Sequence, residues 1–196
     1  LSSEFVIGII NLDKFKEIQN NEKNKANTTL YKESPIFVDS RKKGLGARIL
    51  SNLKKLDLII KELNLKKSNT KTYLDHAYRH GIPIKGVENL KDKLFGLEAN
   101  LDELSAIDFQ KGCYVGQENT ARMKIKNKLR KKIFAIITDK TTEIGDEIVF
   151  NSVTVGKILI NSPYPFGIVK VAEPEFSNFK NRHLTINGIK AKLLLV

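Results

Sequence analysis

Short apolar runs and polar stretches alternate in the first part of the chain. Apolar runs at residues 5–10 and 36–40 predict strands, and we expect the first to be buried. After a turn at 41–44, an extended segment resumes at 45–50. The polar stretch 19–29 has almost nothing to bury and predicts an exposed loop. These elements indicate part of a mixed sheet.

Two segments in the middle of the chain carry apolar residues at spacings of three and four. This pattern predicts amphipathic helices at residues 54–65 and 69–80. Ser68 or Asn69 can cap the start of the second helix. Gly81 follows its end, where a residue in the left-handed conformation is expected.

From about residue 128 the pattern changes to period-two alternation interrupted by turn residues. Strand-like runs occur at 129–138, 147–150, 153–160, 167–171 and 183–196. The last run contains Asn187-Gly188, a strong hairpin signal. Five or six short strands in this length predict a small antiparallel β-barrel, with a domain boundary near residue 127. The fold class is therefore α+β.

The formal net charge of +12 changes this picture less than its size suggests. Six of the basic residues are Arg and 28 are Lys, and the chain holds 17 Asn and 22 Ile. This bias is typical of an AT-rich genome, whereas nucleic-acid binders more often use Arg. A local basic run at 124–132 leaves binding of nucleic acid open. The longest apolar runs have four or five residues, which excludes a membrane-spanning helix.

The one cysteine, Cys113, lies in the string KGCYVGQE, between Gly112 and Gly116. A single cysteine excludes an intrachain disulfide and a four-cysteine iron–sulfur site. The two glycines predict a tight loop with unusual backbone angles. Residues 117–123 predict a helix, so Cys113 would lie near a helix N-terminus, where the dipole and Lys111 favour the thiolate. The alternative is that Cys113 is a small buried apolar residue.

The string from Lys111 to Glu118 is very similar to the signature of the YgfZ-type folate-binding proteins and their mitochondrial relatives. These proteins belong to the superfamily of the aminomethyltransferase (T-protein) of the glycine cleavage system. Other segments resemble that family in the same order: Asp39-Ser40-Arg41 with Leu45-Gly46-Ala47-Arg48, Tyr78-Arg79 with Gly81-Ile82-Pro83, Leu97-Glu98-Ala99-Asn100-Leu101, and Arg122. Family members carry further residues before these segments, so the resemblance implies that the chain is N-terminally incomplete or that the protein is a degraded relative.

The resemblance implies a partial aminomethyltransferase-like, folate-binding α/β region at residues 1–127, followed by the β-barrel at 128–196. It implies a tetrahydrofolate-binding accessory protein that assembles or repairs iron–sulfur clusters in client enzymes, including tRNA-modifying enzymes. Its place would be the cytoplasm of a bacterium or the mitochondrial matrix of a eukaryote. A folate-dependent aminomethyltransferase and an RNA-binding module are the alternatives.

The resemblance also assigns roles to individual residues. Cys113 is expected to be a redox-active or transiently cluster-contacting thiol, with the remaining cluster ligands coming from a partner protein, a second chain or a small thiol. The other candidates are Lys111, which tunes the charge of Cys113; Gln117 and Glu118, which orient the loop; Gly112 and Gly116, which shape its backbone; Arg41, Arg79 and Arg122, which pair with folate carboxylates or form internal salt bridges; Glu98, which contacts the pterin; and Tyr114, which packs or supports the pterin. The three histidines form no convincing metal site, and no resident metal is expected.

Overall fold

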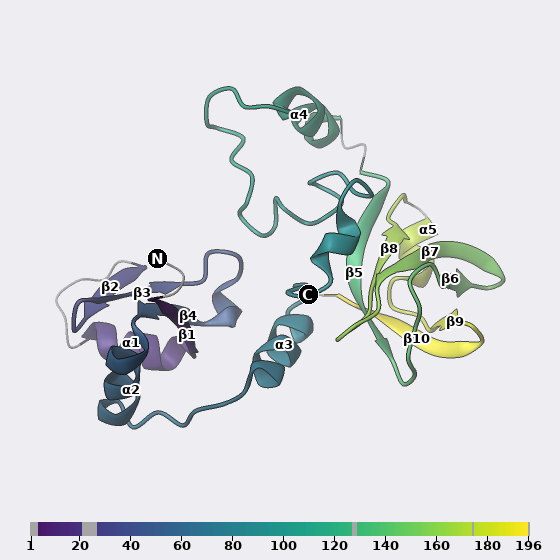
Figure 1. The fold of residues 1–196 in the computed structure, drawn as a ribbon. Coiled ribbons are helices and arrows are strands. Elements are labelled where there is room, and N and C mark those ends of the chain that lie inside the picture. The colour runs from purple at the N-terminus through teal and green to yellow at the C-terminus, as the bar shows by residue number, and fades with distance from the viewer. Residues whose placement is uncertain (1–3, 21–26, 127–128, 174, 196) are drawn as a thin grey trace. The chain divides into compact units, whose positions relative to one another are not determined.

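The computed structural model describes residues 4–20, 27–126, 129–173 and 175–195 (Figure 1). The chain divides into two compact units, Leu1–Thr72 and Tyr73–Val196. The expected domain boundary near residue 127 lies outside the described residues.

The first unit is built on a four-stranded sheet in which every pair of neighbours is antiparallel, so the expected mixed sheet is wrong. Its strands, in spatial order, are β1 (Val6–Ile10), β4 (Ala47–Ser51), β3 (Ser34–Val38) and β2 (Thr28–Tyr31). Three of them lie close to the predicted strands. The fourth, β2, overlaps the end of the predicted loop at 19–29, because its two-residue turn at Lys32 and Glu33 carries no glycine signal; both have positive φ.

One face of this sheet is covered by two helices, α1 (Leu12–Asn20) and α2 (Leu53–Glu62). The core between them contains Phe15, Ile18, Ile36, Ala47, Ile49 and Ile59. Helix α2 confirms the prediction, and the side chain of Asn52 caps it by accepting a hydrogen bond from the Lys55 amide at 2.8 Å. Helix α1 was not predicted, because it buries only Phe15 and Ile18.

The other face of the sheet carries exposed apolar side chains. On the edge strand β1, Ile7 is 58% exposed and Ile9 is 39% exposed. Leu50 on the neighbouring strand β4 and Leu30 on the opposite edge strand β2 are also exposed. Side chains alternate across a strand, so only one set can face the helices. The expectation that the strand at 5–10 is buried is therefore wrong: the side chains of β1 alternate between half-buried and exposed.

Most of helix α3 (Thr70–Arg79) belongs to the second unit, which begins at Tyr73. Asn69 accepts a hydrogen bond from the Thr72 amide at 2.9 Å, so it is the N-terminal cap. Gly81 adopts the left-handed conformation with φ of +71°, and the Ile82 amide donates to the Ala77 carbonyl at 3.0 Å. Both predicted helix signals are confirmed. A short 3-10 helix, η2 (Val87–Leu90), follows.

Residues 96–105 form two consecutive hydrogen-bonded turns. Asn100 and Ser105 have φ of +62° and +56°. Each is the last residue of a turn that is closed by a backbone hydrogen bond. The Leu101 amide donates to the Gly96 carbonyl at 3.0 Å, and the Ala106 amide donates to the Leu101 carbonyl at 2.8 Å. An α-helix does not continue through a residue in the left-handed conformation, so this segment stays as two turns.

The remainder of this unit is a closed six-stranded antiparallel barrel, in the order β10-β5-β8-β7-β6-β9. Its strands are β5 (Lys131–Thr138), β6 (Glu147–Phe150), β7 (Val153–Ile160), β8 (Phe166–Lys170), β9 (Leu184–Ile186) and β10 (Ile189–Leu194). The predicted barrel is confirmed, and Asn187-Gly188 forms the turn between β9 and β10. A short helix, α5 (Glu175–Phe179), was not predicted.

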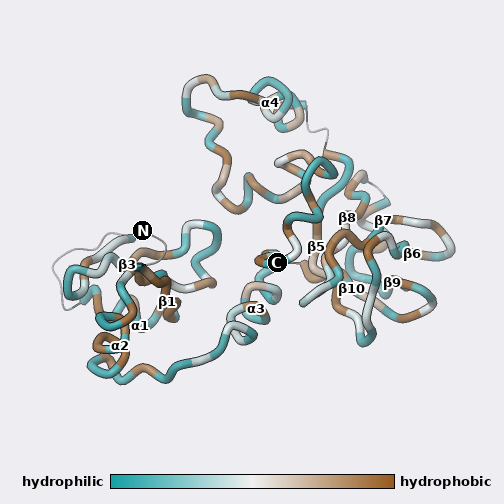
Figure 2. The backbone as a smooth tube through the Cα atoms, viewed as in Figure 1, coloured by the Kyte–Doolittle hydropathy of each residue, from teal (hydrophilic) through white to brown (hydrophobic). Residues whose placement is uncertain are grey.

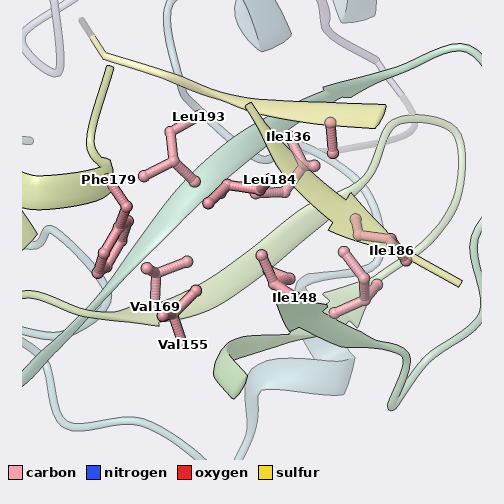
Figure 3. Close-up of a cluster of buried hydrophobic side chains, with 10 residues drawn as sticks. Ile136, Ile148, Val155, Val169, Phe179, Leu184, Ile186 and Leu193 are labelled. Carbon is pink, nitrogen blue, oxygen red and sulfur yellow. The ribbon is translucent and has the colours of Figure 1, made fainter. Parts of the chain in front are cut away.

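The core of the barrel lies between inward-facing aliphatic side chains from all six strands. Figure 3 shows Ile148, Val169 and Leu184 pointing into this space, with Phe179 of α5 at its margin. In Figure 2 the barrel shows brown, hydrophobic stretches as well as teal, hydrophilic ones. Helix α4 (Gln117–Ile125) precedes the barrel and buries none of its side chains.

Candidate functional site

Cys113 lies in an irregular segment that leads from residue 106 to helix α4, and its side chain is exposed. The alternative that Cys113 is a small buried apolar residue is therefore wrong. The neighbouring Val115 is also fully exposed. The thiol is open to a reagent or a partner protein.

The backbone of Gly116 starts helix α4. Gly116 has φ of +82° and ψ of 3°, and its carbonyl accepts hydrogen bonds from the amide and hydroxyl of Thr120 at 3.2 and 3.0 Å. The Gln117 amide donates to the Tyr114 carbonyl at 3.1 Å and closes the turn. Cys113 is three residues before this N-terminal cap, as predicted.

The second glycine of the string behaves differently. The φ of Gly112 lies outside the left-handed region, and a Cβ built on Gly112 meets nothing within 4 Å. The expectation of unusual backbone angles is therefore confirmed for Gly116 and wrong for Gly112. Nothing in the structure explains why a glycine stands at position 112.

Lys111 and Tyr114 contact each other across the loop. The ammonium of Lys111 lies 4.6 Å from the centre of the Tyr114 ring, a cation–π geometry. The Tyr114 hydroxyl is buried and has no hydrogen-bond partner among the described residues. This contact favours a packing role for the ring, and the effect of Lys111 on Cys113 stays a prediction.

Gln117 and Glu118 lie in the first turn of α4. Glu118 is exposed, and its charge suits the positive end of the helix dipole. Within the described part of the chain, neither side chain makes a hydrogen bond to the loop, so their role in orienting it stays a prediction.

The turns before this loop are tied to strand β5. The Glu98 carbonyl accepts a hydrogen bond from the backbone amide of Ile133 at 2.9 Å. The side-chain amide of Asn100 donates to the Ile133 carbonyl at 3.0 Å. The Glu98 carboxylate accepts from the Phe95 amide at 3.0 Å. Glu98 therefore holds a turn together, and one of its carboxylate oxygens is already engaged.

Acidic side chains on these turns neutralise part of the basic run. Lys124 pairs with Asp102, which raises the pKa of Lys124, and Lys132 pairs with Glu103. The ammonium of Lys124 also lies 5.5 Å from the centre of the Phe109 ring. Lys128 lies outside the described residues. Two basic side chains of the run at 124–132, Lys124 and Lys132, are therefore paired with carboxylates.

Two of the three predicted folate-binding arginines already have acidic partners. Arg79 pairs with Asp75 at 2.9 Å, one helical turn earlier on α3. Arg41, in the first unit, holds the buried carboxylate of Asp39 through hydrogen bonds of 3.1 and 2.9 Å from its guanidinium. Arg122 on α4 is exposed and makes no ion pair within the described ranges.

Asp39 is the centre of a charged cluster that the sequence-based site did not include. Arg48 donates to the Asp39 carboxylate at 3.0 Å, alongside Arg41. Burial alone would raise the pKa of Asp39, but the hydrogen bonds from Arg41 and the charges of both arginines outweigh it and lower that pKa. The sequence signal that could have indicated this cluster is one carboxylate, Asp39, followed by two arginines within nine positions.

The histidines do not form a metal centre. His76 and His80 lie one turn apart on and just after α3, with ring centres 4.5 Å apart, and a ring nitrogen of His80 lies 3.0 Å from the His76 carbonyl. Among the described residues, no three His, Cys, Asp or Glu side chains are grouped as a metal site requires. No described helix is long and apolar enough to cross a membrane.

The chain is similar to three proteins named iron–sulfur cluster assembly factor IBA57 homologue, mitochondrial. The identity is 40% over 73 residues for the protein of Phaeosphaeria nodorum, 34% over 104 for that of Dictyostelium discoideum and 35% over 107 for that of Chaetomium globosum. These regions cover 37%, 52% and 53% of this chain and 18%, 25% and 24% of those proteins. The matches thus span a quarter or less of the relatives' length. No family model matches the chain.

Among solved structures, the chain is similar to the glycine cleavage system aminomethyltransferase T from Bartonella henselae. The TM-score is 0.57 at 11% identity, over 90% of this chain and 55% of that one. The fold is aminomethyltransferase-like. The fold expected from the KGCYVGQE string and its flanking segments is therefore confirmed.

Proposed function

We propose that this chain belongs to an iron–sulfur cluster assembly factor in which Cys113 is the redox-active or cluster-contacting thiol. One observation carries the proposal: Cys113 is exposed on the loop that leads into α4. A thiol that receives or passes a cluster must be reachable by another protein. The names of the similar IBA57 proteins support the same role.

The loop supplies a single thiol, and this limits the chemistry. To bind iron, Cys113 loses its proton, and its thiolate provides one cluster ligand. The cluster is therefore cargo, and its other ligands come from an assembly or client protein, a second copy of the chain or a small thiol. Exposed Val115 beside Cys113 leaves room for such a partner to approach.

Tetrahydrofolate binding is part of the proposal, but the predicted residues do not form a ready pocket. Arg41 and Arg79 are paired with carboxylates, and Glu98 accepts a backbone hydrogen bond. A cavity beside Tyr78 and Tyr164 holds only about 10 Å³, roughly one water. Of the predicted carboxylate-binding arginines, only Arg122 is without an acidic partner among the described residues.

The proposed partners are iron–sulfur assembly or client proteins, with tRNA-modifying enzymes among the clients. The proposed place is the mitochondrial matrix in a eukaryote, in agreement with the names of the relatives, or the cytoplasm in a bacterium. These assignments rest on similarity over 37% to 53% of the chain.

Anaerobic reconstitution tests the role of Cys113. The chain is incubated with ferrous iron, sulfide and glutathione, and the visible absorption of a protein-bound cluster is measured after gel filtration. The unsubstituted chain is expected to retain a cluster with glutathione as co-ligand, and Cys113→Ser is expected to lose it.

Val115→Ser is the matched control, because it changes an exposed neighbour on the same loop and keeps the thiol. Equal cluster content in the Cys113→Ser and unsubstituted chains would refute the proposed role of this residue. A loss in Val115→Ser as large as in Cys113→Ser would show that the loop, and not the thiol, is responsible.

Calorimetric titration tests folate separately. Tetrahydrofolate is expected to bind the unsubstituted chain, and Arg122→Gln is expected to weaken binding because it removes a charge that can pair with a folate carboxylate. Lys126→Gln, one charge removed from the exposed end of the same helix, is the control. Absence of binding by the unsubstituted chain would remove folate from the proposal and leave the thiol chemistry intact.

A further inference from the structure

A groove on the outside of the barrel gathers three lysines from three neighbouring strands. It encloses about 330 Å³ and is lined by Lys131 of β5, Lys157 of β7 and Lys170 of β8, with Glu147 of β6 at its side. This volume is within the range of small-molecule sites. None of the residues that line the groove belongs to the Cys113 loop.

The strand register brings two of these lysines together. Lys131 and Lys170 are directly opposite partners on β5 and β8, and both are exposed. Like charges in directly opposite positions destabilise a sheet. The third lysine, Lys157, pairs across β7 and β8 with Ile168, two residues before Lys170. The three ammonium groups therefore line one face of the barrel.

One acidic side chain at the groove, Glu147, offsets only part of the charge of these lysines. Glu147 is the cross-strand partner of Lys157, but its carboxylate accepts a hydrogen bond from the Thr154 hydroxyl at 2.9 Å. The Lys170 ammonium donates to the Thr154 carbonyl at 3.1 Å, which holds it at the groove. Among the described residues, none of the three lysines has an ion-pair partner within 4 Å. The groove keeps a net charge of +2.

The neutral part of the lining decides what kind of anion fits. It contains Val155, Ile168, Thr154 and two glycines, Gly145 and Gly156, and it includes no aromatic ring. Bases that bind proteins by stacking need such rings. Lysine is a point-charge ligand for phosphate. The lining therefore suits phosphate groups rather than bases.

We propose that this groove binds a phosphate-bearing ligand through Lys131, Lys157 and Lys170. The ligand is either a free oligophosphate compound or the phosphodiester backbone of RNA, both of which present closely spaced negative charges. The bound anion relieves the repulsion between Lys131 and Lys170. This site is independent of the proposed cluster chemistry at Cys113.

Binding is measured with the full chain and two probes, inorganic pyrophosphate by calorimetry and a single-stranded U12 RNA by fluorescence anisotropy. The test variant replaces Lys131, Lys157 and Lys170 with Gln. The control variant replaces Lys140, Lys190 and Lys192 with Gln, which removes the same charge from exposed positions elsewhere on the barrel. Thermal unfolding verifies that both variants are folded.

The test variant is expected to bind at least about tenfold more weakly, and the control to bind within about twofold of the unsubstituted chain. For RNA, the slope of log K against log salt should also fall by about 2, or roughly 0.7 for each lost phosphate contact. Binding of pyrophosphate alone identifies a free phosphate compound, and binding of RNA alone identifies a phosphodiester backbone. Absence of binding to either probe, or equal weakening in both variants, overturns the proposal.

Discussion

Arg48 donates a hydrogen bond of 3.0 Å to the buried carboxylate of Asp39, nine residues earlier in the chain. Arg41 holds the same carboxylate, and the Asp39 amide donates to the Gly46 carbonyl at 2.9 Å. These contacts close the loop between β3 and β4. The segment that resembles the folate-binding family therefore has a structural role in this chain.

We expect Asp39→Asn to destabilise the first unit by about 3 kcal/mol, because it leaves two arginines without their shared counter-charge. The measurement is hydrogen exchange of the amides in β3 and β4. Asp57→Asn is the control, because it removes an exposed ion pair to Lys67. Solvent screens such a pair, so this substitution should lower the stability much less. Equal effects of the two substitutions would contradict the structural role.

The lowered pKa of Asp39 predicts acid sensitivity of this unit. A carboxylate with a lower pKa in the folded than in the unfolded state contributes stability above its unfolded pKa of about 3.9, and this is lost as the pH falls through the folded pKa. The stability difference between the unsubstituted chain and Asp39→Asn should be constant near neutral pH and shrink below about pH 4. A difference independent of pH down to pH 2 would rule out this linkage.

Gly46 is required by both its backbone angle and its surroundings. Its φ is +87°, and a Cβ on Gly46 would lie 2.1 Å from the carbonyl oxygen of Ile10. Gly46→Ala should therefore cost more than the roughly 1–2 kcal/mol of a left-handed alanine. Gly188→Ala is the comparison, because Gly188 has φ of +76° and open space around it. Denaturant unfolding should show the larger loss for Gly46→Ala; equal losses would mean that the close approach is tolerated.

The two glycines of the cysteine loop should respond differently to alanine. Gly116→Ala introduces strain at φ of +82° and should shift the start of α4, whereas Gly112→Ala enters open space. The alkylation rate of Cys113 should change in Gly116→Ala and stay unchanged in Gly112→Ala. The reverse order would show that the loop is not organised by the start of α4.

Tyr78 joins α3 to the barrel within the second unit. Its hydroxyl donates to the Ile136 carbonyl at 2.6 Å, and burial raises the pKa of Tyr78 to about 12. We expect Tyr78→Phe to cost about 1–3 kcal/mol, because it leaves that carbonyl without this partner. Denaturant unfolding at neutral pH measures this loss.

The raised pKa of Tyr78 also predicts a response to alkali. The folded state favours the protonated phenol, so the stabilisation is complete below the unfolded pKa of about 10 and is lost as the pH rises through about 12. Tyr78→Phe should lack this loss and the matching phenolate absorbance step. A tyrosine step near pH 12 that persists in the variant would assign it to another residue.

The sequence predicted the barrel well because local signals and tertiary structure agree there. Strands β6 and β7 have the predicted bounds, since period-two alternation is interrupted by turn residues on each side. The signals at Asn69 and Gly81 similarly placed both ends of α3. Helix α1 carries too few buried residues for periodicity to reveal it.

The position of Cys113 was predicted, but the contacts of the other candidate residues were predicted only in part. The KGCYVGQE string placed Cys113 ahead of a helix, and the structure agrees. The string did not indicate that Glu98 holds a turn or that Arg79 pairs with Asp75. The partner of a charged side chain depends on which groups the fold places close to it. Pairing of Lys124 with Asp102 across 22 positions is a similar case.

By itself, the sequence determined helices α2, α3 and α4, most of the strands, that the C-terminal part is a barrel, and which loop carries the thiol. These properties depend on the local periodicity of apolar residues, turn chemistry and a specific string. Only the tertiary structure decided which face of β1 is uncovered, that Cys113 is exposed, and that Lys131 lies opposite Lys170. Burial and charge pairing depend on residues that are distant in the chain, and only folding sets their distances.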